Sequence, residues 1–272
     1  MILRGNLEDC GGPLSVRYVD LQQSEGHLPT MTEPGELASA ALSAGARAVE
    51  RATEAVGDVV AAAKPKLRGW LHTVTSPVAL AAGVVLIVLA PTGPATAAAA
   101  AYTATSVILF TTSALYHRGD WSPAAENRLK RLDHANIFLL IAGSYTPFAV
   151  LALDGNARVA VLSAVWGAAV VGVLFRVFWV EAPRWLYTAL YIGLGWAAGF
   201  FFPQLIRGAG IPAFVLIAVG GLLYTAGGVV YGLKRPDPSP KWFGFHEIFH
   251  ACTVAAFACQ YIAASFVVYR AA

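Results

Sequence analysis

Residues 246–268 read HEIFHACTVAAFACQYIAASFVV, a histidine-containing start followed by an apolar run long enough to cross a membrane. A spanning helix needs about 20 predominantly apolar residues. His246 and His250 are separated by one helical turn, so a helix places them on the same face. Metal-ligating groups at membrane depth are costly and indicate a functional site. The stretch therefore predicts a membrane helix with a candidate site at its beginning.

Six further apolar runs precede this one, and the composition agrees with them. Of the 272 residues, 57% are hydrophobic and 13% are charged, whereas a soluble domain carries about twice that charged fraction. We therefore predict an all-α, polytopic membrane protein in which seven transmembrane helices form one bundle. The predicted spans are Leu71–Ala90, Ala95–Tyr116, Asp133–Leu153, Val159–Val180, Trp185–Phe202, Ile211–Leu233 and His246–Val268.

Basic residues are divided unevenly between the two sets of helix ends. Because Lys and Arg are enriched in cytoplasmic loops, we expect a cytoplasmic N-terminus, a C-terminus on the opposite side and a location in the plasma membrane. The basic residues follow helix ends and form no single stripe, which argues against nucleic-acid binding. The twelve on the predicted cytoplasmic side are Lys64, Lys66, Arg68, Arg118, Arg128, Lys130, Arg131, Arg176, Arg184, Lys234, Arg235 and Lys241, and the three on the other side are Arg158, Arg207 and Arg270.

The sequence predicts a cytoplasmic tail at residues 1–65 and a membrane domain at residues 66–270. The first thirty residues are polar and lack the apolar segment of a signal peptide, so we expect disorder there. Glu36–Ala63 is rich in alanine and mixes Glu with Arg, a composition that favours helix. A short cytoplasmic helix and a flexible tail both remain open for this segment.

Two other predicted spans bring polar groups to the depth of His246 and His250. Ser113 and His117 end the second span one turn apart, and Asp133 opens the third. His117, His246 and His250 would give zinc three nitrogen ligands and leave the fourth position for water, as in catalytic sites. Zinc lowers the pKa of such a water to about 7. Asp133 would accept a proton from it, and Ser113 would hydrogen-bond a developing oxyanion.

The three remaining histidines are His27, His72 and His134, and each could be a packed residue without a role in metal binding. His72 begins the first span at the same level, and we expect it to hydrogen-bond a ligand histidine, with direct ligation as the weaker alternative. His134 is one residue from Asp133, about 100° around a helix, so the two are not expected to face one metal. We interpret His134 and His27 as packed residues, each bonded to a neighbouring carbonyl group.

Taken in order, these motifs resemble the hemolysin III family of bacterial membrane proteins. The motifs are Ser113-Ala-Leu-Tyr-His117, Arg131-Leu-Asp133-His134 running into Gly143-Ser-Tyr-Thr-Pro147, and His246-Glu-Ile-Phe-His250. That family is related to the progestin and adipoQ receptors and, more distantly, to alkaline ceramidases. The resemblance covers about residues 66–270 and implies a zinc site with His117, His246 and His250 as ligands, Asp133 near the metal water and Ser113 close by. In the related receptors and ceramidases such a site is linked to hydrolysis of lipid amides, whereas the bacterial branch takes its name from haemolytic activity.

Residues 246–250 also match HExxH, in which the glutamate is the general base of a metalloprotease. Leu153-Asp154-Gly155 resembles an acidic element of membrane-embedded proteases. However, the charge distribution places Asp154 at the outer end of the third span, about 30 Å from the histidines. It also precedes HExxH in the chain, whereas those proteases place it afterwards. We therefore interpret Glu247 as a supporting or interfacial residue.

These observations favour a zinc-dependent hydrolase that acts on an amide or ester bond of a lipid-like substrate at the cytoplasmic side of the bilayer. One alternative is a non-enzymatic regulator of membrane lipid or energy state with a structural zinc ion, which a closed four-ligand site would favour. The other is a pore-forming haemolysin. The polar groups gather at one end of the predicted bundle and line no path through it, which argues against a pore.

Overall fold

The computed structural model describes residues 42–49, 51 and 65–271. The chain divides into two units, Met1–Gly57 and Asp58–Ala272. Within the predicted alanine-rich helix Glu36–Ala63, residues 42–49 and 51 are helical. The rest of that segment and the first thirty residues lie outside the described residues, so the division at residue 65 stays a prediction.

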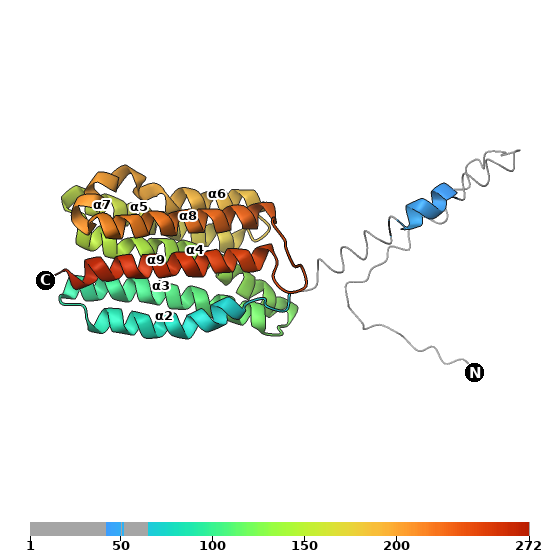
Figure 1. Cartoon of the computed structure of the whole chain (residues 1–272), viewed down its shortest axis with the longest axis horizontal. Helices are drawn as coiled ribbons and strands as arrows, with labels where there is room; N and C mark the ends of the chain where they lie inside the picture. The colour runs from blue at the N-terminus through green and yellow to red at the C-terminus, as the bar shows by residue number, and fades with distance from the viewer. Residues whose placement is uncertain (1–41, 50, 52–64, 272) are drawn as a thin grey trace, which may run out of the picture. The chain divides into compact units, whose positions relative to one another are not determined.

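Among the described residues, seven helical segments are long and apolar enough to cross a membrane, and they pack side by side in one bundle (Figure 1). The described residues contain no strand, apart from an isolated bridge between Ser239 and Phe243. The prediction of an all-α, polytopic membrane protein is therefore confirmed. The elements are α2 (Trp70–Val88), α3 (Gly93–Arg118), α4 (Pro123–Ala152), α5 (Gly155–Phe178), α6 (Arg184–Gly195), the 3-10 helix η1 (Ala197–Phe201), α7 (Phe202–Ala209), α8 (Ile211–Leu233) and α9 (Phe245–Tyr269).

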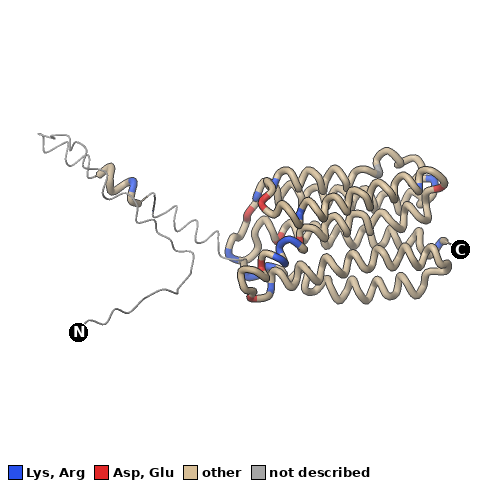
Figure 2. The backbone as a smooth tube through the Cα atoms, turned by 180° about the vertical axis from the view of Figure 1, so that it is seen from behind, with Lys and Arg blue, Asp and Glu red and all other residues tan. Residues whose placement is uncertain are grey.

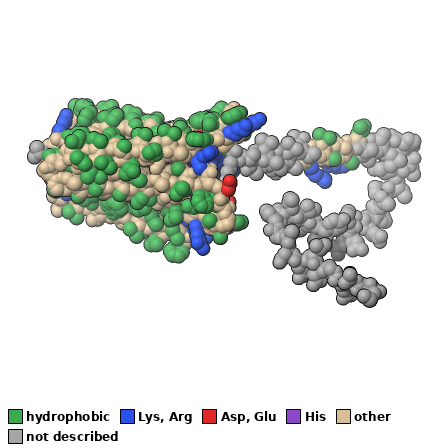
Figure 3. Space-filling model, turned by 90° about the horizontal axis from the view of Figure 1, so that it is seen from below, with side chains coloured by type: hydrophobic (Ala, Val, Ile, Leu, Met, Phe, Trp, Pro, Cys, Tyr) green, Lys and Arg blue, Asp and Glu red, His purple; other side chains and the backbone are tan. Residues whose placement is uncertain are grey.

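The surface of the bundle has the polarity that a lipid surrounding requires. Charged residues gather at its two ends, with more of them at the end opposite the C-terminus (Figure 2). Hydrophobic side chains cover the middle (Figure 3), and Val171, Leu222 and Phe200 are among the large apolar residues that are more than half exposed. An exposed apolar surface of this extent marks contact with a membrane or with other proteins.

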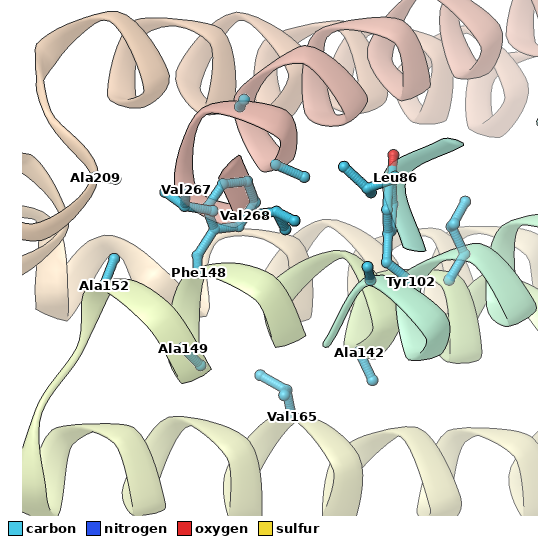
Figure 4. Close-up of a cluster of buried hydrophobic side chains, with 14 of the residues drawn as sticks. Leu86, Tyr102, Ala142, Phe148, Ala149, Ala152, Val165, Ala209, Val267 and Val268 are labelled. Atoms are coloured by element: carbon cyan, nitrogen blue, oxygen red, sulfur yellow. The ribbon is translucent and has the colours of Figure 1, made fainter. Parts of the chain in front are cut away.

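Close helix packing holds α2, α3 and α4 together. A Cβ atom at Gly83 would lie 2.1 Å from Thr103 Cγ2, and one at Gly143 would lie 1.9 Å from Thr105 Oγ1. Only a residue without a side chain fits at these crossings, as is typical of helix contacts in membranes. Next to them lies a core of buried apolar side chains, which includes Leu86, Tyr102, Ala142, Phe148, Val165 and Val268 (Figure 4).

Helix α4 begins earlier than the sequence analysis predicted. It starts at Pro123, so Asp133 lies in the third turn of the helix and does not open it. The Ser122 hydroxyl accepts a hydrogen bond from the Ala125 N–H at 3.4 Å, and Pro123 occupies the first turn, both common features of helix beginnings. The hydrophobicity criterion missed these turns because charged residues such as Arg128 and Lys130 occupy them.

The fifth predicted span, Trp185–Phe202, is interrupted in the structure. It consists of α6, η1 and α7 and extends from Arg184 to Ala209. Tyr145 compensates part of the break, because its hydroxyl donates to the carbonyl groups of Leu194 at 3.1 Å and Gly195 at 2.7 Å. Backbone groups freed at membrane depth need such partners, and neighbouring helices supply them.

Candidate metal centre

Three histidine rings from two helices converge near one end of the bundle. His117 lies in the last turn of α3, and His246 and His250 lie in the first two turns of α9. One ring nitrogen from each lies within 4.8 Å of those of the other two, and the Nε2 atoms of His117 and His246 are 3.2 Å apart. These are the three residues predicted from the sequence as zinc ligands, and the identity of a bound metal stays a prediction.

Three imidazole nitrogens form a donor set that zinc accepts, and one separation among them is close to that of two ligands on a tetrahedral zinc ion. Zinc binds imidazole nitrogen at about 2.0–2.1 Å, so two such ligands lie about 3.3–3.4 Å apart. The 3.2 Å between His117 Nε2 and His246 Nε2 is close to that value. His117 is 8% exposed and His250 is 2% exposed, so protein shields most of the group from its surroundings.

Asp133 and Ser113 stand beside the histidines, as the sequence analysis predicted for residues near the metal. Asp133 Oδ2 is 3.7 Å from His117 Nε2, and the aspartate side chain is 13% exposed. The buried Ser113 hydroxyl and the Asp133 carboxylate line the same cavity, where the single serine O–H is available as a hydrogen-bond donor. An oxyanion contact by Ser113 stays a prediction.

His134 follows its predicted role as a packed residue. Its Nδ1 is 2.7 Å from the carbonyl oxygen of Lys130, and its Nε2 is 3.1 Å from the Tyr231 hydroxyl. A carbonyl only accepts, so Nδ1 carries the proton and Nε2 accepts from Tyr231. The Tyr187 hydroxyl in turn lies 3.3 Å from that of Tyr231.

Sequence reasoning missed the tyrosines that surround His134. Tyr231 comes from α8, and Tyr187 and Tyr191 come from α6, where they are spaced by four residues. The Tyr191 hydroxyl donates to the His134 carbonyl at 2.8 Å. The sequence signal that could have indicated them is the spacing of Tyr187 and Tyr191, which places two tyrosines on one helix face near the basic end of an apolar segment.

Glu247 of the HExxH match caps a helix in this structure. It is 1% exposed, its Oε2 accepts from the Gly244 N–H at 2.8 Å and its Oε1 pairs with Arg68. Both carboxylate oxygens are therefore engaged in contacts that support the start of α9. Asp154 lies between α4 and α5, beyond the end of α4 that is remote from Asp133, and its side chain is fully exposed. The placement of both residues argues against a protease.

His72 makes a different contact from the predicted hydrogen bond. Its ring stacks on that of His250, with centroids 3.8 Å apart and planes inclined by 8°. The first turn of α2 carries His72 and the second turn of α9 carries His250, and the two rings meet face to face. Neither ring nitrogen of His72 has a hydrogen-bond partner among the described residues.

Two adjoining cavities border the histidine group. The smaller, of about 40 Å³, is lined by His246, His250, Asp133 and Ser113 among others. The larger, of about 130 Å³, has mainly apolar walls such as Leu140, Phe148 and Val161. Both cavities share wall residues that include Leu109, Ile137, Tyr191, Phe249 and Thr253. An apolar space therefore lies directly beside the candidate metal centre.

Fold and site together define a polytopic membrane protein with a three-histidine cluster near one end of a seven-helix bundle. The sequence matches the model of the family described as "Haemolysin-III related" over residues 60–261. The chain belongs to this family, which confirms the resemblance found in its motifs.

Two curated relatives agree with the family assignment. The chain is 31% identical over 140 residues to the "Hemolysin-3 homolog" of Bacillus subtilis (strain 168), a match that covers 51% of this chain. It is also 31% identical over 163 residues to "Hemolysin-3" of Bacillus cereus, which covers 59% of this chain. The matched segments span 65% of the first relative, just under two thirds, and 74% of the second.

Proposed function

We propose that this protein is a zinc-dependent hydrolase of the plasma membrane that cleaves an amide or ester bond in a lipid-like substrate. The observation that carries the proposal is the convergence of His117, His246 and His250 within 4.8 Å, beside the Asp133 carboxylate. Three neutral nitrogen donors with a position left open are typical of catalytic zinc. When bound, zinc would supply a Lewis acid and an activated water.

In this proposal Asp133 accepts a proton during the reaction. Its Oδ2 lies 3.7 Å from His117 Nε2, beyond direct hydrogen-bonding distance, so this oxygen is available to a small molecule bound beside the histidines. A hydrogen bond from the Ser113 hydroxyl, which lines the same cavity, would hold the carboxylate in one orientation. A positioned carboxylate that takes a proton in the transition state is a general base.

The adjoining cavity supports a substrate with an apolar chain. Its walls include Leu140, Phe148 and Val161, and it shares Phe249 and Ile137 with the cavity of the histidine group. A hydrocarbon chain would occupy the apolar space, and the bond to be cleaved would lie at the boundary between the two cavities. A buried apolar pocket with few convergent polar groups is the usual form of a small-molecule site.

We further propose that the histidine group lies at the cytoplasmic side of the membrane. The support is the excess of basic residues at that end of the helices, twelve against three. Alkaline phosphatase fused after residue 272 should be active and green fluorescent protein fused there should be dark. The reverse pair of results would place the site on the other side.

The hydrolase proposal is tested by comparing lipids of cells that overproduce the wild type or Asp133→Ala. We expect one lipid class to be consumed only by the wild type, with zinc present in both purified proteins. Zinc in both and no lipid consumed would instead favour a regulator with a structural metal. A steady current through the reconstituted protein would favour a pore.

A further inference from the structure

His72 is held by aromatic rings on two sides at the beginning of α2. Its ring stacks on His250 with centroids 3.8 Å apart, and it meets Phe110 edge to face at 5.0 Å and 74°. The residue is 2% exposed. These contacts fix the plane of the imidazole, so its nitrogen atoms occupy defined positions.

Both nitrogen atoms of this fixed ring lack a hydrogen-bond partner among the residues that the structure describes. A neutral imidazole carries one N–H donor and one acceptor nitrogen. Burying both without partners is unfavourable, and most buried polar atoms in proteins have a partner. His134, which lies nearby, shows the usual situation, because protein groups satisfy both of its nitrogens.

The His72 ring borders the space where a ligand of the metal centre would lie. His72 lines the same cavity as Ser113, Asp133, His246 and His250. Yet it lies outside the group of three histidines whose nitrogens are within 4.8 Å of one another. Its position suits contact with a molecule held beside the metal better than contact with the metal itself.

We propose that His72 is a ligand-binding residue that hydrogen-bonds the polar head of an acyl compound bound in this pocket. The head would be an amide, ester or related group, and its apolar chain would lie in the adjoining cavity. The inference rests on the function proposed for the site. It adds a specificity contact that comes from α2, a helix that contributes neither the three histidines nor Asp133.

The test uses dodecanoyl hydroxamate, whose two oxygens chelate zinc and whose head resembles an amide. Its affinity for the zinc-loaded full-length protein in detergent is measured by calorimetry. His72→Phe keeps a flat ring to stack on His250 and removes both nitrogens. We expect unchanged zinc content and affinity weaker by about ten-fold, as loss of one good hydrogen bond predicts. Acetohydroxamate, which has the same head without the chain, should be weakened by the same factor.

His134→Phe is the matched control, since His134 lines the same cavity but has both nitrogens already paired. It should change the hydroxamate affinity by less than about two-fold, because it removes no group available to a ligand. His72→Asn places an amide near one ring-nitrogen position and His72→Gln places it near the other. The variant whose amide lies at the position that contacts the ligand should recover most of the affinity. If His72→Phe does not fold, the difference between these two variants carries the test.

Unchanged affinity in His72→Phe would show that His72 only packs against its neighbours. Loss of zinc from that variant would make His72 part of the metal centre. The inference would also be overturned if His72→Gln and His72→Asn bound the hydroxamate equally, and both as weakly as His72→Phe. Failure of the zinc-loaded wild type to bind either hydroxamate would remove both proposals. A His72 effect in a protein that consumes no lipid would remove the hydrolase alone.

Discussion

The three histidines of α3 and α9 differ from His134 of α4 in how their ring nitrogens are satisfied. His134 pairs one nitrogen with the Lys130 carbonyl and the other with the Tyr231 hydroxyl. In the histidine group, Nε2 of His246 faces Nε2 of His117 at 3.2 Å. Facing nitrogens of neutral rings share one proton at most, whereas a metal ion satisfies both lone pairs. The comparison shows that burial alone does not identify a metal-binding histidine.

The largest expected effect is on zinc content, which should depend on the histidines of α3 and α9 and not on His134. Purified wild type should contain about one zinc per chain, and His250→Ala should lose most of it, since removing one of three ligands leaves a weak site. His134→Phe should keep its zinc, because His134 points its nitrogens at protein groups. Elemental analysis of the three proteins, purified without added metal, measures the difference.

Equal zinc in wild type and His250→Ala would remove the proposed centre. Loss of zinc from His134→Phe, with zinc retained in His250→Ala, would show that metal binding depends on His134 and not on His250. Thermal unfolding of each variant in detergent establishes that the metal content is measured on folded protein.

The second-largest expected effect concerns Asp133, which lies beside the three histidines but is not one of the proposed zinc ligands. Asp133→Ala should keep about one zinc and lower hydrolysis by about 100-fold or more, as expected when a general base is removed. Turnover of the lipid identified by the cell comparison measures the effect at equal zinc content. Unchanged turnover would refute the role of base, and loss of zinc would make the carboxylate a ligand.

Ser113→Ala should have a smaller effect than Asp133→Ala. In the proposed site its hydroxyl donates to the Asp133 carboxylate, so its removal should loosen the orientation of the base without removing it. A hydrogen bond to a charged group contributes about 1.5–3 kcal/mol, which corresponds to a decrease in kcat of at least about ten-fold. Zinc content should not change. A decrease as large as that of Asp133→Ala would instead favour the direct oxyanion contact.

The membrane helices were predictable because long apolar runs are a local property of the sequence. The pair His246 and His250 was also predictable, since the helical period alone places such residues on one face. The proximity of His117 and Asp133 followed from the charge distribution, which aligned the ends of the spans. The start of α4 at Pro123 was missed because its first turns are charged and escape a hydrophobicity criterion.

Other contacts depend on how the helices rotate and pack, and no local pattern contains that information. The stacking of His72 on His250 requires α2 and α9 to present particular faces to each other. The contact of Tyr231 with His134 joins α8 to α4, and the contact with Tyr187 joins α8 to α6. A tyrosine within an apolar run shows by itself neither its partner nor its direction.

The smallest expected effects test the tyrosines that pair with His134. Tyr231→Phe leaves both His134 Nε2 and the buried Tyr187 hydroxyl without a partner, so it should lower the free energy of unfolding by about 1–3 kcal/mol. Tyr187→Phe removes only the outer donor of this chain and should lower it by about 1 kcal/mol or less. Denaturation in detergent measures both, with zinc content as the control. If Tyr231→Phe released zinc while Tyr187→Phe did not, the network around His134 would support the metal centre, and the two histidine regions would have to be treated as one site.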